Sequence, residues 1–208
     1  GETDSQKRDA LLANMTDAVA RLVLADNYNQ TLALSVAEAA AVRDIDAGAR
    51  FIRALEAKGK LDRAVEFLPG DADIQKLEND KKGFSRPELA VLMAYAKLDL
   101  DAEILDSALP DDKAFAPTLA AYFPKQAAEK FAAELGQHRL KREIISTTIA
   151  NRLVNLAGPF FVARMKEMSG CSGAEVARAF VVAEGAFGLE ALKARIDALD
   201  GKAKAEIQ

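Results

Sequence analysis

Apolar residues recur at helical spacings along most of the chain, most clearly in residues 140–167, LKREIISTTIANRLVNLAGPFFVARMKE. The first half of this stretch places four aliphatic side chains at spacings of four, four and three, on one face of a helix: Ile145, Ile149, Leu153 and Leu156. The Gly158-Pro159 pair predicts an abrupt end to that helix. A second helix is expected over residues 159–168.

A neighbouring stripe of the same predicted helix carries Ile144 followed by three polar residues, Thr148, Asn151 and Asn155. Arg152 lies at the edge of the apolar stripe, between the two asparagines. Amide and guanidinium groups beside an apolar face need hydrogen-bond partners if packing covers them. The pattern therefore indicates either a polar network inside the domain or a contact with another domain. In both cases, replacing Asn155 by leucine is expected to lower stability or assembly.

Residues 83–97, GFSRPELAVLMAYAK, combine several signals of a helix start. Ser85 and Glu88 have the spacing of a capping box, in which the side chain of each residue accepts a hydrogen bond from the backbone N–H of the other. The apolar run over 89–96 is too dense for a half-exposed helix, so we expect this helix to be central. The corner at residues 158–159 is expected to fold two helices against it, with the aromatic pair that follows filling the angle.

The rest of the chain follows the same pattern and predicts an all-α fold, an irregular multi-helix bundle of roughly nine to ten helices with no sheet. A polar segment at 26–35 is expected to separate the first two helices, and Ser35 with Glu38 has the spacing of a capping box for the second. Residues 1–208 are expected to form a single helical domain, with 110–124 as the one candidate boundary for a subdivision. The other elements are predicted at 6–24, 35–58, 62–68, 71–81, 113–122, 125–135, 172–186 and 189–199.

Composition and charge narrow the class of protein. Half of the residues are hydrophobic, no apolar run approaches the ~20 residues of a membrane-spanning helix, and a cytoplasmic location is expected. The net charge is −4 and the pI is near 5.2, which disfavours a nucleic-acid partner. A local basic cluster at Arg139, Lys141 and Arg142 keeps a nucleic-acid adaptor as an alternative, although a solvated helix face is the favoured interpretation.

Motifs that carry chemistry are absent from the sequence. His138 is the only histidine and Cys171 the only cysteine, too few for a zinc site. No glycine-rich nucleotide-binding fingerprint occurs. The acidic run between residues 99 and 112 lacks the glycine and the closing glutamate of an EF-hand, so a solvated helix end and turn is expected there. We therefore predict no catalytic, cofactor-binding or metal-binding residue in this segment.

Four segments, in order and with approximate spacing, resemble the carboxy-terminal region of the large bacterial NAD-specific glutamate dehydrogenases: residues 26–35, 83–97, 140–167 and 179–200. The resemblance implies that the chain is a fragment of a longer polypeptide whose catalytic core lies upstream. It implies oxidative deamination of L-glutamate with NAD for the parent enzyme, which is expected to be a homo-oligomer. None of the family's catalytic or NAD-binding motifs maps onto this chain.

Three functional hypotheses follow. The first is a structural and oligomer-forming domain of a glutamate dehydrogenase, inactive alone. The second is a regulatory module that binds a small effector in a pocket lined by convergent polar groups. The third is the nucleic-acid adaptor, disfavoured by charge. The candidates for structural or interface roles are Arg86, Asn151, Arg152 and Asn155.

Overall fold

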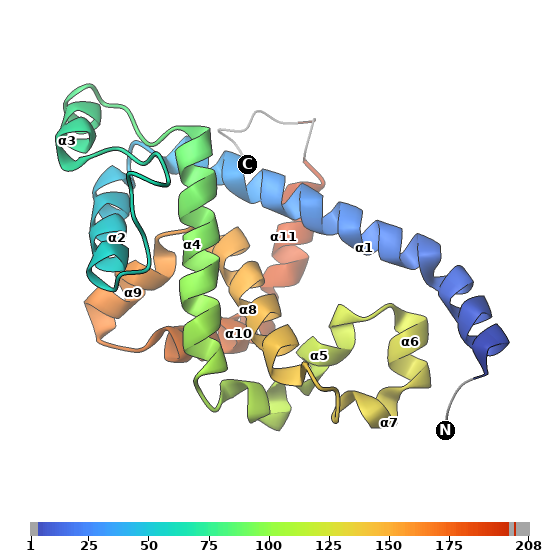
Figure 1. Ribbon diagram of the computed structural model, residues 1–208. Coiled ribbons are helices and arrows are strands. Elements are labelled where there is room, and N and C mark those ends of the chain that lie inside the picture. The colour runs from blue at the N-terminus through green and yellow to red at the C-terminus, as the bar shows by residue number, and fades with distance from the viewer. Residues whose placement is uncertain (1–3, 200–201, 203–208) are drawn as a thin grey trace.

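The computed structural model describes residues 4–199 and 202, and this part of the chain is helical without any strand (Figure 1). The all-α prediction is confirmed. The elements in chain order are α1 (Ser5–Ala40), α2 (Ile45–Ala57), α3 (Asp71–Asn79), α4 (Arg86–Leu105), the 3₁₀ turns η1 (Leu109–Asp111) and η2 (Lys113–Phe115), α5 (Ala116–Tyr122), α6 (Lys125–Lys130), α7 (Ala132–Leu135), α8 (Lys141–Ala157), α9 (Phe161–Ser169), α10 (Gly173–Phe187) and α11 (Leu189–Asp197).

The core is centred on α4 and α8, which lie side by side in the middle of the molecule (Figure 1). Three residues of the predicted α8 stripe, Ile145, Ile149 and Leu153, are fully buried, and so are several residues of the dense apolar run in α4. The fourth stripe residue, Leu156, is 37% exposed because it lies in the last turn of α8, at the rim of the core. The central position expected for residues 89–96 is confirmed.

The first helix differs from the prediction. Residues 26–35 do not interrupt it, and α1 is one helix of 36 residues. Ser35 caps nothing; its hydroxyl donates to the carbonyl of Thr31, four residues earlier, at 3.1 Å. Polar side chains that bond to the preceding turn are compatible with a continuous helix, and burial of Ala33 and Ala37 stabilises this part of it. The break comes later, in the turn at 41–44.

The corner after α8 forms as predicted, although its packing differs in part. Gly158 adopts φ +86°, a conformation that favours glycine. Phe160 is buried and its ring lies 6.0 Å from that of Phe51 and 6.3 Å from that of Phe84, while Phe161 is partly buried against the same core. Helix α8 packs on α4 as expected. Helix α9 instead packs mainly on α2, α8 and α10, because the aromatic cluster directs it there.

The acidic run at 99–112 is solvated only in part: Asp106 and Asp111 are exposed, as expected, but other carboxylates of the run are packed against neighbouring segments. The side chain of Asp99 is only 12% exposed and accepts hydrogen bonds from Lys58 at 2.8 Å and Lys60 at 2.6 Å. Burial alone would raise the pKa of Asp99, but the two ammonium groups outweigh it and hold that pKa below its usual value. Glu103 accepts from the backbone N–H of Gly173 at 2.7 Å. Tertiary packing thus turns this segment into a set of links from α4 to its neighbours.

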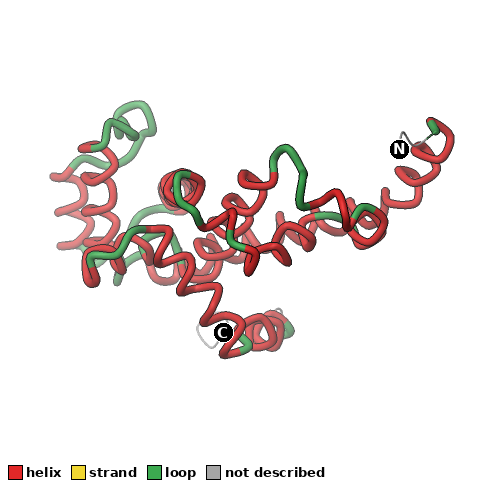
Figure 2. The backbone as a smooth tube through the Cα atoms, turned by 90° about the horizontal axis from the view of Figure 1, so that it is seen from below, coloured by secondary structure: helices red, strands yellow, loops and turns green. Residues whose placement is uncertain are grey.

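Residues 120–138 contain no fully buried side chain. Helices α6 and α7 bury no residue, and the single helix predicted over 125–135 is interrupted at Phe131, where φ is −113°. In Figures 1 and 2 these short helices lie beside the N-terminal half of α1, away from α2 and α3. We call α5, α6 and α7 with the turn to residue 138 the α5–α7 module. A domain subdivision near 110–124 stays a prediction.

Candidate functional site

The predicted site residue Arg152 connects two helices of the core. Its guanidinium forms an ion pair with Glu184 on α10. The Glu184 side chain is 12% exposed, so the pair is partly shielded from solvent. A guanidinium is well suited to such a partly buried pair because it presents several donors in a rigid plane. Arg152 therefore links α8 to α10.

The two predicted asparagines are half-buried on α8. The side-chain oxygen Oδ1 of Asn155 is buried and has no hydrogen-bond partner among the described residues. A buried amide oxygen without a partner lowers stability, because it has given up its hydrogen bonds to water. Asn155 is thus not part of a closed polar network within the described chain.

We expect Asn155→Leu to leave the melting temperature of the 208-residue chain unchanged or to raise it. The substitution removes the unpaired oxygen and improves helix propensity, for a gain of about 0–1 kcal/mol in the free energy of unfolding. This reverses the expectation drawn from the sequence. Thermal unfolding followed by circular dichroism measures it, with Asn151→Leu, one turn earlier, as the matched control. A melting temperature clearly below that of the unmodified chain would show that the amide has a stabilising partner.

Arg86, the fourth predicted residue, joins α4 to the C-terminal half of α1. It donates to Glu38 Oε2 at 2.7 Å, to the Ser35 hydroxyl at 3.1 Å and to the Thr31 carbonyl at 3.5 Å. The contact explains why the polar residues near position 35 belong to a continuous helix. The side chains of Ser35 and Glu38 accept hydrogen bonds from the Arg86 guanidinium, so solvent is not their only partner.

The N-terminal half of α1 presents a surface that the sequence reasoning missed. Met15 and Ala33 are eighteen positions apart, which is five turns at 3.6 residues per turn, so the face that α1 buries at Ala33 continues towards its N-terminus. Met15 is half-buried there. Beside it lies an exposed apolar stripe, which we call the α1 stripe: Leu12 (54% exposed), Val19 (46%) and Val23 (53%). The α1 stripe lies wholly within the helix predicted over 6–24, but spacing along the chain does not show that the rest of the fold leaves it uncovered.

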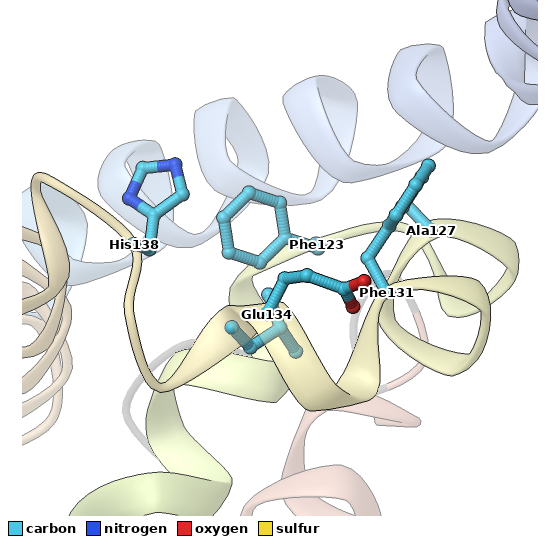
Figure 3. Close-up of a pocket in the computed structure, with 6 residues that line it drawn as sticks. Phe123, Ala127, Phe131, Glu134 and His138 are labelled. Atoms are coloured by element: carbon cyan, nitrogen blue, oxygen red, sulfur yellow. The ribbon is translucent and has the colours of Figure 1, made fainter. Parts of the chain in front are cut away.

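A shallow crevice of about 240 Å³ opens on the α5–α7 module (Figure 3). Its wall is mostly apolar, and the residues that line it are Phe123, Ala127, Phe131, Glu134, Leu135 and His138. The His138 ring lies 5.5 Å from the Phe123 ring, and its Nδ1 accepts a hydrogen bond from the Leu140 backbone N–H at 3.1 Å. Helix α1 runs past the crevice on the side of His138 and Phe123 (Figure 3). None of the four predicted site residues lines it.

The remaining candidate residues from the sequence do not form a further functional site among the described residues. Arg142 of the basic cluster forms an ion pair with Asp111 and donates to the carbonyls of Leu105 and Ser107, so it holds η1 against α8. Cys171 is a free, exposed thiol. No group of three or more potential metal ligands occurs in the described ranges 4–199 and 202. Within the same ranges, no helix is both long and apolar enough to cross a membrane.

Comparison with known families decides the affiliation. Residues 81–208 match the family model described as "Glutamate dehydrogenase, C-terminal". The chain belongs to this glutamate dehydrogenase family. The resemblance inferred from the four sequence segments is therefore confirmed. Residues 1–37 match a second model, described as "Bacterial NAD-glutamate dehydrogenase, catalytic domain". The second match lies almost entirely in α1.

Curated relatives agree with this family. The chain is 46% identical over all of its 208 residues to an NAD-specific glutamate dehydrogenase of Pseudomonas aeruginosa, and 42% identical over the same length to one of Halomonas elongata. A third, from Mycobacterium tuberculosis, is 37% identical over 198 residues, or 95% of this chain. The chain spans only 12–13% of the length of these relatives. It corresponds to a C-terminal region of a much longer polypeptide.

Proposed function

We propose that this chain is the helical C-terminal region of a large NAD-specific glutamate dehydrogenase, and that it packs through α1 on the catalytic domain of the same polypeptide. The whole enzyme converts L-glutamate, NAD⁺ and water to 2-oxoglutarate, ammonium, NADH and a proton. We assign the hydride transfer and the NAD site to the catalytic domain and no catalytic residue to this chain. Its role is structural.

The observation that carries the proposal is the extent of α1. The match to the catalytic-domain model ends at residue 37, yet α1 continues without interruption to Ala40. Its C-terminal half belongs to the helical core, because Ala33 and Ala37 are buried there and Arg86 holds it to α4. One helix is therefore shared by both regions, and a helix is a rigid connection over this length.

The α1 stripe supplies the apolar area for this contact. Contiguous exposed apolar side chains on a soluble protein commonly mark an interaction site. Fully burying an exposed valine or leucine side chain contributes about 1.5–3 kcal/mol. The three stripe residues are already about half covered, so each can add about half of that to a docking contact. The match of residues 1–37 to the catalytic-domain model supports the catalytic domain as the partner that covers them.

Arg86 and Arg152 have a different role in this proposal. Both form their ion pairs inside the described chain, with Glu38 and Glu184. We propose that they hold helices of the C-terminal region together and do not contact the catalytic domain. The effector-binding alternative, homo-oligomer formation and a cytoplasmic location stay predictions that rest on the sequence and the family.

The proposal is tested with the double variant Val19→Asp, Val23→Asp in the full-length polypeptide. Two carboxylates in a buried apolar contact are strongly unfavourable, so we expect a fall of several degrees in the first melting transition and a lower rate of glutamate-dependent NAD reduction. In the 208-residue chain the same variant should have little effect, because both side chains are about half exposed there. Val182→Asp, on the exposed face of α10, is the control. Equal behaviour of the variant and the control in the full-length enzyme would contradict docking through α1.

A further inference from the structure

The crevice of the α5–α7 module is not explained by the packing of this chain. We infer that it is a second contact for the catalytic domain, and that it receives an apolar or aromatic side chain from the polypeptide that precedes α1. This inference rests on the proposed function, because it takes the catalytic domain as the partner. It adds a specific place on the C-terminal region that the family match does not indicate.

The chemistry of the crevice favours a protein side chain over a metabolite. Its volume of about 240 Å³ is below the roughly 300–1,000 Å³ of typical small-molecule pockets. Glu134 and His138 are the only lining residues with polar side chains. Nδ1 of His138 is already used by the Leu140 backbone N–H. A polar substrate or nucleotide would lose hydrogen bonds to water here and regain few, whereas an apolar side chain loses none.

The position of the crevice indicates which polypeptide fills it. The α5–α7 module lies beside the N-terminal half of α1 in both views of the backbone (Figures 1 and 2). Helix α1 runs along the side of the crevice that carries His138 and Phe123 (Figure 3). A domain joined to the N-terminal end of α1, and packed on the α1 stripe, therefore starts next to this opening. In this inference the same domain contacts both apolar surfaces.

The α5–α7 module has few buried contacts of its own. Helices α6 and α7 have six and four residues and bury none of them. Helices this short are marginal in water unless tertiary contacts support them. Phe131 lies between them and is only half-buried, with the Lys130 ammonium 5.6 Å from its ring centre. A side chain inserted against Phe123 and Phe131 would provide the missing contact.

Photo-cross-linking in the full-length polypeptide tests the inference. The probe is p-benzoylphenylalanine, an aromatic residue that reacts with C–H bonds in contact with it, placed at position 131 in one variant and at position 23 in another. Position 67 is the control, because Phe67 is 89% exposed and lies between α2 and α3, at the other end of the molecule from the module (Figure 1). Products are located by mass spectrometry and sized on a denaturing gel.

We expect position 131 to cross-link within the same chain to peptides that precede α1, and position 67 to give no such product. Cross-links from position 23 but not from 131 would overturn this inference and leave the proposed docking of α1 intact. Absence of upstream products from both positions would overturn both. A product of doubled mass from position 131 would assign the crevice to a second copy and also overturn the inference. If the variant at 131 fails to fold, position 123 in the same crevice provides the same readout.

Discussion

Leu153→Ala should lower the free energy of unfolding by about 2–5 kcal/mol, the range for removing a fully buried leucine from a tightly packed core. Leu153 has no exposed surface and lies where α8 packs on α4. The truncation leaves a cavity that the surrounding helices cannot close without losing other contacts. Since whole domains are stable by only about 5–15 kcal/mol, this change should nearly unfold the chain at elevated temperature. Urea unfolding followed by circular dichroism measures it.

Leu156→Ala is the matched control, because the sequence places it on the same stripe of the same helix. Leu156 is 37% exposed at the rim of the core, so its truncation should cost well under half as much as that of Leu153. Equal losses for the two variants would mean that α8 is rotated or extended relative to the structure. The comparison therefore tests the orientation of α8 directly.

Gly83→Ala should lower the free energy of unfolding by about 2–3 kcal/mol through overpacking. A Cβ at position 83 would lie 2.3 Å from the carbonyl carbon of Ala41 and 2.6 Å from its oxygen. The obstacle is backbone, not the flexible end of a side chain, so it moves only if the end of α1 moves. Thermal unfolding of the purified chain measures the loss.

Gly185→Ala provides the opposite expectation. Among the residues that the structure describes, no neighbouring atom lies within 4 Å of a Cβ at this exposed position of α10. Alanine in place of glycine inside a helix stabilises by roughly 0.5–1 kcal/mol, so this variant should melt slightly higher. If Gly83→Ala also melted at or above the unmodified chain, the close approach of Gly83 to Ala41 would be disproved.

The contact between Ala41 and Gly83 also organises the molecule around the two family matches. Those matches cover residues 1–37 and 81–208 and leave 38–80 between them. The intervening segment forms α2 and α3, and the chain returns after them to the place where α1 ended. The part of α1 that matches the catalytic-domain model is thus joined directly to the C-terminal core, and α2, which the intervening segment contributes, packs into the same core.

The sequence by itself determined most of the local structure. The capping box of Ser85 and Glu88 is present, with the Ser85 backbone N–H donating to Glu88 at 2.6 Å, and Ser172 with Glu175 forms another at the start of α10. Gly158 and Gly188 both adopt positive φ where helices were predicted to end. These features depend on a few neighbouring residues and on backbone sterics, so the signal is complete within a short window. The family, too, was recognisable from residue patterns alone.

Only the tertiary structure decided which side chains meet. Ser35 and Glu38 have the spacing of a cap, but Arg86 from α4 binds both, and burial of Ala33 and Ala37 keeps α1 continuous. Asp99 belongs to an acidic run that looks solvated, yet two lysines from elsewhere in the chain pair with it. The α1 stripe and the crevice arise the same way, from what neighbouring helices cover and leave uncovered. Burial and ion pairing between residues distant in sequence depend on how the helices pack against one another. The spacing of residues along the chain does not determine that packing.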